Sequence, residues 1–231
     1  MLFPSFCLNC QKEGSYLCQD CFSLIEITNR QHCPFCNPPK ITPEGCTCKF
    51  CKKNKNLDGL YYTAPYNNFI IKKIITQFKY PPYIKELSKP LSFFIIQYFK
   101  SFEYQPTFLI KTFQSDFLLI PVPLYKKKLK ERGFNQSEEI AKELSFFWKI
   151  PLISDVLLKI KETSSQIKLS KEEREKNLKE AFICKNFEKI KGKKIILIDD
   201  VFTTGSTMEE CSRILKQAGA KEILGIVIAR E

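Results

Sequence analysis

The sequence has little glycine, with eight residues in a chain of 231. These glycines form neither G-x-x-x-x-G-K-S/T, the phosphate loop of many ATPases, nor G-x-G-x-x-G, the dinucleotide-binding turn. Both absences argue against a P-loop ATPase and against a dinucleotide-dependent enzyme. Histidine is rarer still: the single residue, His32, adjoins a cysteine and is interpreted as a bystander, not a metal ligand.

Long apolar runs are also missing. The longest, Leu91–Phe99, is far shorter than the roughly 20 residues that a membrane-spanning helix needs. Met1–Cys10 has neither a basic start nor an apolar run with a cleavage site. We therefore expect a cytoplasmic protein, in which cysteines serve metal or redox chemistry and not a disulfide framework.

Basic residues dominate the charge. Lysine and arginine number 37 against 25 acidic residues, which gives a formal charge of +12. This balance suits polyanionic partners such as nucleic acid, nucleotides or pyrophosphate, although a general lysine and isoleucine bias would produce the same charge. With 44% hydrophobic residues, the length allows one sizeable α/β core plus a small appendage.

The cysteines divide the chain into two regions. Nine of the eleven lie before residue 55, in a segment with little apolar periodicity that could not bury a core unaided. The short stretch Lys52–Asn56 leads into a different kind of sequence. We predict a Cys-rich zinc-ribbon module over residues 1–55 and an α/β domain over residues 56–231.

The front segment contains four C-x-x-C pairs, and two such pairs can surround one tetrahedral Zn²⁺. Eight cysteines in this pattern predict two Cys₄ sites, with structural metals that fold the module and leave no ligand position open for catalysis. Pairing in sequence order or crossed pairing both fit, and Cys46 could replace Cys48. In sequence order the ligands are Cys7, Cys10, Cys18 and Cys21, then Cys33, Cys36, Cys48 and Cys51.

From Leu60 onward the sequence alternates between helical and strand patterns, which predicts a mostly parallel sheet flanked by helices. Pro90 is expected to kink or break its helix, and Asn135 with Glu138 fits a capping box. The expected helices are Asn67–Tyr80, Ile84–Phe99, Asn135–Phe147 and Ser206–Gln217; the expected strands are Phe117–Ile120, Lys194–Ile198 and Glu222–Ala229.

One of these strands ends in a group of polar residues. Asp199 and Asp200 follow the apolar strand directly, and the small polar turn Thr203–Thr207 then opens a helix. Ligands bind beyond the carboxyl ends of strands in open α/β sheets, and a helix N-terminus with free N–H groups can hold a phosphate. Two carboxylates there suit a ribose diol. A purely structural acid pair is the alternative, but the T-T-G-S-T turn that follows is unusual for one.

Ile195–Thr207 resembles the 5-phosphoribosyl-1-pyrophosphate (PRPP) signature of type I phosphoribosyltransferases. The wider pattern is similar to the ComF family of competence-associated, amidophosphoribosyltransferase-like proteins. The resemblance covers nearly the whole chain and rests on the C-x-x-C pairs, Pro121-Val-Pro123, Arg132-Gly-Phe-Asn-Gln136, Gln166 with Arg174, Asn177 and Phe182, the D-D-V-F-T-T-G-S-T run, and Ala229-Arg230.

The resemblance implies roles for individual residues. Asp199 and Asp200 would bind the ribose hydroxyls and, with Arg132, serve catalysis. The loop Leu124–Gly133, with Lys126 and Arg132, would bind pyrophosphate, although a solvated loop fits equally well. A hood over Glu162–Asn177, with Gln166 and Arg174, would close over the substrate. The 5′-phosphate would be held by Thr203, Thr204, Gly205, Ser206 and Thr207.

The resemblance also implies an activity: Mg²⁺-dependent transfer of phosphoribosyl from PRPP to an unknown acceptor, with release of pyrophosphate, in connection with DNA uptake. A second hypothesis is a non-enzymatic competence factor that binds single-stranded DNA and uses PRPP at most as a signal. Its support is the charge of +12 and the content of 20 phenylalanines and nine tyrosines, most of which we expect in the core. A catalytically dead scaffold is a third possibility, disfavoured by the intact acid pair.

Overall fold

The computed structural model describes residues 4–101, 117–163, 178 and 180–231. The helices are α1 (Gln19–Ser23), α2 (Lys49–Lys52), α3 (Phe69–Lys79), α4 (Ser88–Ser101), α6 (Lys126–Arg132), α7 (Gln136–Trp148) and α9 (Ser206–Gln217), with short 3₁₀ turns at Pro43–Gly45, Lys85–Leu87 and Phe187–Lys189. The strands are β1 (Gly59–Pro65), β2 (Phe117–Pro121), β3 (Leu157–Lys159), β4 (Phe182–Cys184), β5 (Lys194–Ile198), β6 (Val201–Phe202) and β7 (Glu222–Arg230).

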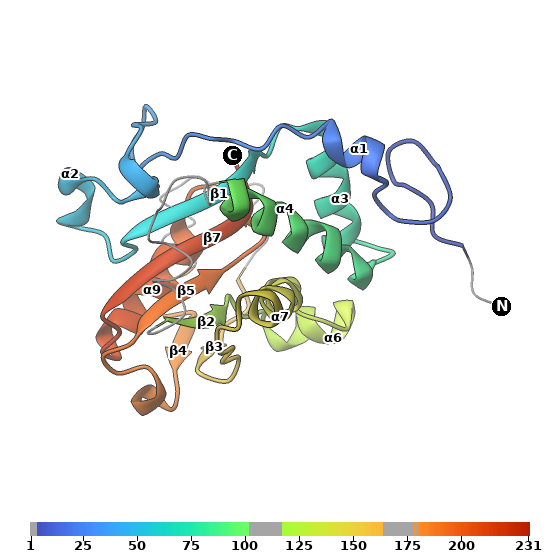
Figure 1. Ribbon diagram of the computed structural model, residues 1–231. Helices are drawn as coiled ribbons and strands as arrows, with labels where there is room; N and C mark the ends of the chain where they lie inside the picture. The colour runs from blue at the N-terminus through green and yellow to red at the C-terminus, as the bar shows by residue number, and fades with distance from the viewer. Residues whose placement is uncertain (1–3, 102–116, 164–177, 179) are drawn as a thin grey trace.

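The central sheet has the strand order β1-β7-β5-β2, and every pairing in it is parallel; β6 adds a short parallel pairing to β7. β3 and β4 form a separate antiparallel hairpin. Helices α3, α4 and α7 cover one face of the sheet and α9 covers the other (Figure 1). The predicted α/β class with a mostly parallel, helix-flanked sheet is therefore confirmed.

Alternate residues of each strand supply the two cores. Ile196 and Ile198 of β5 point toward α3, α4 and α7, whereas Ile195 and Leu197 point toward α9. This alternation follows from the two-residue period of a strand, and burial on both faces explains why the strand reads as a continuous apolar run.

Several helices begin where local side chains satisfy their first N–H groups. Asn68 caps α3 by accepting from the Ile70 and Ile71 N–H groups. The isoleucines of that helix and Phe78 are buried. Asn135 caps α7 by accepting from the Ser137 N–H at 3.2 Å. Glu138 does not close the predicted capping box toward Asn135, since its carboxylate pairs with Lys142 at 3.2 Å.

Two further local predictions were wrong. Pro90 does not kink a helix that starts at Ile84, because α4 starts at Ser88 and proline in a first helical turn loses no backbone hydrogen bond. Lys126–Arg132 is not a loop but the helix α6, which ends where Gly133 adopts φ +83°. A charged run without breakers forms this helix, although its lack of an apolar period hid it from the sequence pattern.

The Cys-rich segment packs against the α/β core at several places. Phe22 of α1 stacks on Phe94 of α4 with ring centroids 4.3 Å apart. Gln31 bonds both the backbone N–H and the carbonyl of Tyr62 on β1. Figure 1 shows α1 and α2 at opposite ends of the molecule. Within the described ranges, no helix combines the length and apolar character needed to cross a membrane.

Candidate phosphoribosyl site and metal sites

A pocket of about 470 Å³ lies at the carboxyl ends of β2 and β5. These strands are neighbours, but the chain continues from β2 to α7 on one face and from β5 to α9 on the other. Such a change of face between adjacent parallel strands leaves a crevice in which ligands bind. The pocket therefore lies where the topology of the sheet predicts a ligand site.

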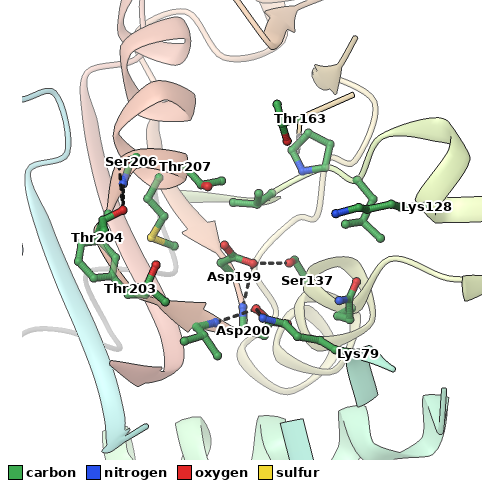
Figure 2. A pocket seen from close by; sticks show the side chains of 18 of the residues that line it. Lys79, Lys128, Ser137, Thr163, Asp199, Asp200, Thr203, Thr204, Ser206 and Thr207 are labelled. Carbon is green, nitrogen blue, oxygen red and sulfur yellow. Dashed lines mark hydrogen bonds and ion pairs between the residues drawn. The ribbon is translucent and has the colours of Figure 1, made fainter. Parts of the chain in front are cut away.

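The turn Thr203–Thr207 forms one wall of this pocket (Figure 2). Gly205 caps α9 with φ +78°, a conformation that side chains rarely adopt, and a Cβ there would lie 2.4 Å from Cζ of Phe202. The Thr204 and Ser206 hydroxyls are 2.9 Å apart. Hydroxyls and the N–H groups of a helix N-terminus thus face one space, an arrangement suited to a phosphate.

Asp199 contributes the first of the two carboxylates. Its Oδ1 accepts from the Ser137 hydroxyl at 2.8 Å and from the Asp200 N–H at 2.9 Å (Figure 2). Burial, reinforced by the neighbouring Asp200 carboxylate, raises the pKa of Asp199 to about 7. Near neutral pH this group can therefore change protonation state as charged ligands enter or leave.

Asp200 is 3% exposed and is paired with a cation that the sequence motifs did not identify. Its Oδ1 lies 2.9 Å from Nζ of Lys79, the last residue of α3, and also accepts from the Val201 N–H at 2.8 Å. Burial works against the charge of Lys79, but the two carboxylates outweigh it and raise its pKa. The other oxygen, Oδ2, is buried and has no hydrogen-bond partner among the described residues.

Arg132 supplies unpaired donors to the same pocket. Its Nε and Nη1 are buried without a partner among the described residues, and its guanidinium lies 5.9 Å from the Tyr83 ring centroid. Burial lowers the pKa of Arg132. Residues four apart share a helix face, so Lys128 lines the pocket with Arg132, whereas Lys126 is exposed and lies outside the lining.

The residues after Arg132 each have a distinct position. Asn135 donates its amide to the Val122 carbonyl at 3.0 Å and so ties the start of α7 to the end of β2. Gln136 lines the pocket, is 4% exposed, and has an Oε1 without a partner in the described part of the chain. Together with Ser137, these side chains place one helix start against the acid pair.

Beyond β3 the structure describes only the start of the expected hood. Lys159 and Thr163 line the pocket, and the lysine donates to the threonine hydroxyl at 2.8 Å. Burial lowers the pKa of Lys159, and the nearby Lys128 adds to this shift. Gln166 and Arg174 lie outside the described residues.

The predicted site residues therefore divide into three groups. The pocket brings together Asp199, Asp200, Arg132 and the whole turn, while Lys126 lies away from it. Gln166 and Arg174 form the third group, outside the described residues. Sequence reasoning missed Lys79, Ser137 and Lys159, and it covered Lys128 only as part of the loop Leu124–Gly133. Ser137 directly follows the R-G-F-N-Q run and could have been noticed there, whereas nothing around Lys79 marks it.

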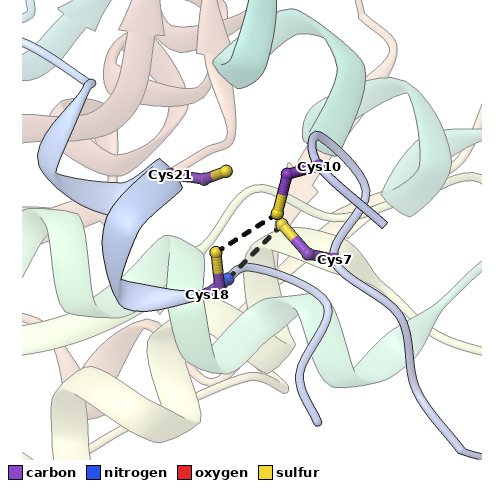
Figure 3. Close-up of side chains that lie close together, drawn as sticks. All are labelled: Cys7, Cys10, Cys18 and Cys21. Carbon is purple, nitrogen blue, oxygen red and sulfur yellow. Dashed lines mark hydrogen bonds between the residues drawn. The ribbon is translucent and has the colours of Figure 1, made fainter. Parts of the chain in front are cut away.

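Eight cysteines gather into two groups, each with its sulfur atoms within 4.8 Å of one another: Cys7, Cys10, Cys18 and Cys21, and Cys33, Cys36, Cys48 and Cys51. Figure 3 shows the first group, in which the Cys10 and Cys18 sulfurs are 3.5 Å apart. A tetrahedral Zn²⁺ with Zn–S bonds of about 2.3 Å would separate its sulfurs by roughly 3.8 Å. Both groups fit structural zinc sites.

The grouping follows sequence order, so neither the crossed pairing nor the exchange of Cys46 for Cys48 occurs. Cys46 is exposed and lies outside both groups. His32 is a bystander, as predicted: its Nδ1 lies 2.7 Å from the Tyr62 hydroxyl, and it belongs to neither group.

Comparison with known proteins agrees with this geometry. Residues 129–231 match the family model described as "Phosphoribosyl transferase domain". Competence protein ComFC of Streptococcus pneumoniae is 28% identical over 95% of this chain and 90% of its own. Competence protein F of Haemophilus influenzae is 39% identical over 46% of each chain. DNA utilization protein YhgH of Escherichia coli (strain K12) is 33% identical over 46% of this chain and 45% of its own.

Fold, pocket and family model together define a protein with a domain of the phosphoribosyltransferase class. The two Cys₄ groups and the match to ComFC along almost the whole chain narrow this class further. Along at least 90% of its length the chain is therefore similar to the ComFC competence proteins of two species, at 27–28% identity. The matches to the Haemophilus and Escherichia proteins span less than half of those relatives' length.

Proposed function

We propose that this protein binds PRPP and transfers its phosphoribosyl group to an acceptor, with release of pyrophosphate, in support of DNA uptake. One observation carries the proposal: a single pocket holds buried acceptors, Asp200 Oδ2 and Gln136 Oε1, and buried donors on Arg132, all beside a phosphate-type turn. None of these atoms has a hydrogen-bond partner among the described residues. Buried polar groups are normally satisfied, so a ligand with hydroxyls and anionic groups is the natural complement. PRPP is such a ligand.

The roles follow from position. The turn Thr203–Thr207 takes the 5′-phosphate, and the two carboxylates accept from the ribose hydroxyls. Arg132 and Lys128 face the pyrophosphate, whose charge must be neutralised as the bond from C1 to the leaving oxygen breaks. The hood residues Gln166 and Arg174 remain a prediction in this scheme, and Lys126 can reach the pyrophosphate only from outside the pocket lining.

Magnesium fits the donor set at the acid pair. Mg²⁺ prefers oxygen ligands and is usually held by one or two carboxylates together with substrate phosphates. Asp200 Oδ2 is buried and unpaired among the described residues, so it offers such an oxygen. When bound with PRPP, the ion would neutralise charge on the leaving pyrophosphate.

The link to DNA uptake rests on the relatives, two of which are named competence proteins and one a DNA utilization protein. A cytoplasmic location is consistent with handling of imported DNA and stays a prediction. The acceptor is open: a base, an amine and nucleic acid all remain candidates.

Release of pyrophosphate tests the transfer directly. The full chain is incubated with PRPP, Mg²⁺ and one candidate acceptor at a time, and pyrophosphate is measured with a coupled assay. Release that depends on the acceptor and is lost in Arg132→Met supports transfer. Tight PRPP binding without release for any acceptor class would leave PRPP as a ligand and contradict the enzymatic proposal.

A second candidate is binding of single-stranded DNA without catalysis. Its support is a set of exposed rings with lysines over them: Phe146 under Lys149 at 4.3 Å and Phe147 under Lys100 at 5.0 Å. Exposed aromatic rings beside cations can stack bases and contact phosphates. Under this alternative, oligonucleotide affinity falls steeply with added salt and falls again in Phe146→Ala/Phe147→Ala protein, while pyrophosphate release is absent.

A further inference from the structure

Arg230, the last residue of β7, joins the second Cys₄ group to the core. Its guanidinium donates to the backbone carbonyls of His32 at 3.3 Å, Cys33 at 3.1 Å and Pro34 at 3.5 Å. Cys33 is itself a predicted metal ligand. Arginine is suited to this role because its planar fork can serve several acceptors at once.

The same guanidinium also reaches toward the phosphate turn. It lies 5.6 Å from the Tyr62 ring centroid and 5.7 Å from that of Phe202. Phe202 lies directly against Gly205, where an added Cβ would meet Cζ at 2.4 Å. A short chain of contacts therefore runs from Cys33 through Arg230 and Phe202 to the turn.

A second connection leads to the helix that starts at this turn. Glu209, in the first turn of α9, accepts from the Asn56 N–H at 2.9 Å and from the Leu57 N–H at 3.2 Å. It also accepts from the Asn56 side-chain amide at 2.8 Å. Asn56 follows α2, which contains Cys51. The C-terminal part of the second Cys₄ group is therefore held against α9 through Glu209.

The first Cys₄ group has a different environment. Its segment packs on α4 through the Phe22–Phe94 stack. Figure 1 shows its helix α1 at the opposite end of the molecule from α2. Among the described residues, these contacts connect the second Cys₄ group, and not the first, to the phosphate turn.

We infer that the second Cys₄ group, with its metal, holds the phosphate turn in its binding conformation, and that Arg230 is the positioning residue that connects them. Loss of metal from this group should loosen Thr203–Thr207 and the start of α9. Loss of metal from the first group should not. The use of the turn as a phosphate site rests on the proposed function. The dependence of the turn's conformational order on the second Cys₄ group does not rest on it.

Hydrogen exchange tests the connection without any activity. Exchange is followed by mass spectrometry in peptides over residues 200–210, in the zinc-loaded full chain and in Cys48→Ser/Cys51→Ser. The matched control is Cys7→Ser/Cys10→Ser, which also removes one metal. We expect the exchange rate over residues 203–209 to rise by at least about fivefold in the second-group variant, because loss of roughly one hydrogen bond reduces protection by that factor. The exchange rate should stay unchanged in the control.

The cysteine variant could unfold as a whole, and loss of protection from exchange in β5 would reveal this. Arg230 variants keep the test decisive in that case. Arg230→Gln should loosen the same peptide while both zinc ions and the β5 protection are retained. Arg230→Lys should give protection of this peptide between those of Arg230→Gln and wild type, because an ammonium lacks the planar fork that serves three carbonyls. The inference would be overturned if exchange over the turn were unchanged in Arg230→Gln. It would also be overturned if both cysteine variants increased that exchange equally.

PRPP titration of the same proteins separates the two claims. If the turn loosens as described but wild-type protein binds no PRPP, the proposed function fails and the connection stands. If wild-type protein binds PRPP and Arg230→Gln binds it equally well with an equally ordered turn, the connection fails and the proposed function stands.

Discussion

Gln136 presents a buried amide oxygen to the pocket with no partner among the described residues. An unpaired acceptor of this kind costs free energy that a ligand N–H or O–H can recover. We predict that Gln136→Leu weakens PRPP binding by about 0.5–1.5 kcal/mol, or roughly 2- to 12-fold. The same substitution should leave folding stability equal or higher, since it removes the unsatisfied group.

Calorimetric PRPP titration and thermal unfolding of the same samples check both parts of this prediction. Gln97→Leu, a half-buried position on α4 outside the pocket, is the matched control. Unchanged PRPP affinity in Gln136→Leu would remove this side chain from the ligand site.

Asp199 makes the stability of the protein depend on pH. Its pKa is raised from an ordinary 3.8 to about 7 by burial and by Asp200. The folded state thus holds this proton where the unfolded chain has lost it, so this group lowers stability progressively as pH rises from about 4 to about 7. Asp199→Asn should match wild type near pH 4 and be more stable at pH 8, by about 1–3 kcal/mol.

Unfolding in urea at pH 4, 6 and 8 measures this difference. Asp155→Asn is a control of opposite sign, because the hydrogen bond and charge of Lys189 lower the pKa of Asp155, and removing that carboxylate should bring no stabilisation at pH 8. A pH-independent gap between wild type and Asp199→Asn would contradict the raised pKa.

Motif residues could be predicted from the sequence because a motif holds them in one continuous segment. The acid pair and the turn follow one strand, and the structure places all of them at the pocket. Lys79 could not be predicted, since its contact with Asp200 depends on how α3 lies against a strand more than a hundred residues later. Its position at the end of an amphipathic helix resembles that of any solvated lysine.

At the level of elements, the turn before α9 depends on a glycine for two separate reasons. Gly205 has a positive φ, and Phe202 fills the space that a Cβ would occupy. We predict that Gly205→Ala destabilises the protein by about 2–4 kcal/mol, the sum of backbone strain and a steric clash. It should also weaken phosphate binding, because the turn must shift.

Gly192→Ala is a matched control for the backbone part of this effect. Gly192 has φ +74° and no atom within 4 Å of an added Cβ, so its substitution carries the strain without the clash. Its expected cost is about 1 kcal/mol. Equal costs for the two variants in denaturant unfolding would mean that the Phe202 ring does not constrain the turn.

Apolar periodicity predicted the elements that bury a face. The strand Lys194–Ile198 and the helix Ser206–Gln217 have the expected bounds, because each combines a clear apolar pattern with a glycine or a polar boundary. The helix α6 escaped prediction because none of its residues is buried. A helix without a buried face can be predicted only from the helix propensity of its residues, which is a weak signal.

For the whole molecule, the pairing of cysteines was open from sequence, since sequence-order and crossed pairing use the same C-x-x-C spacings. Only the fold, which places α1 and α2 at opposite ends, excludes the crossed arrangement. The division at residue 55 stays a prediction. The hydrogen bond from Arg230 to the Cys33 carbonyl nevertheless shows that the Cys-rich segment and the core share contacts.

Metal content tests the grouping of the cysteines. Purified protein should contain two zinc ions per chain, because each Cys₄ group supplies a closed tetrahedral site. Cys46→Ser should keep both ions, and Cys48→Ser should lose one. Elemental analysis of the three proteins measures this, and a loss of zinc in Cys46→Ser would contradict the ligand assignment.

The most direct test of the account is a calorimetric titration of PRPP with Mg²⁺ into the zinc-loaded protein, with Asp199→Asn/Asp200→Asn as control. Losing one charge-assisted hydrogen bond costs about 1.5–3 kcal/mol, so Asp200→Asn alone should weaken binding roughly 10- to 150-fold, and the double variant more. Binding that the double variant loses is the predicted result. No binding by folded, zinc-loaded wild-type protein would contradict the account.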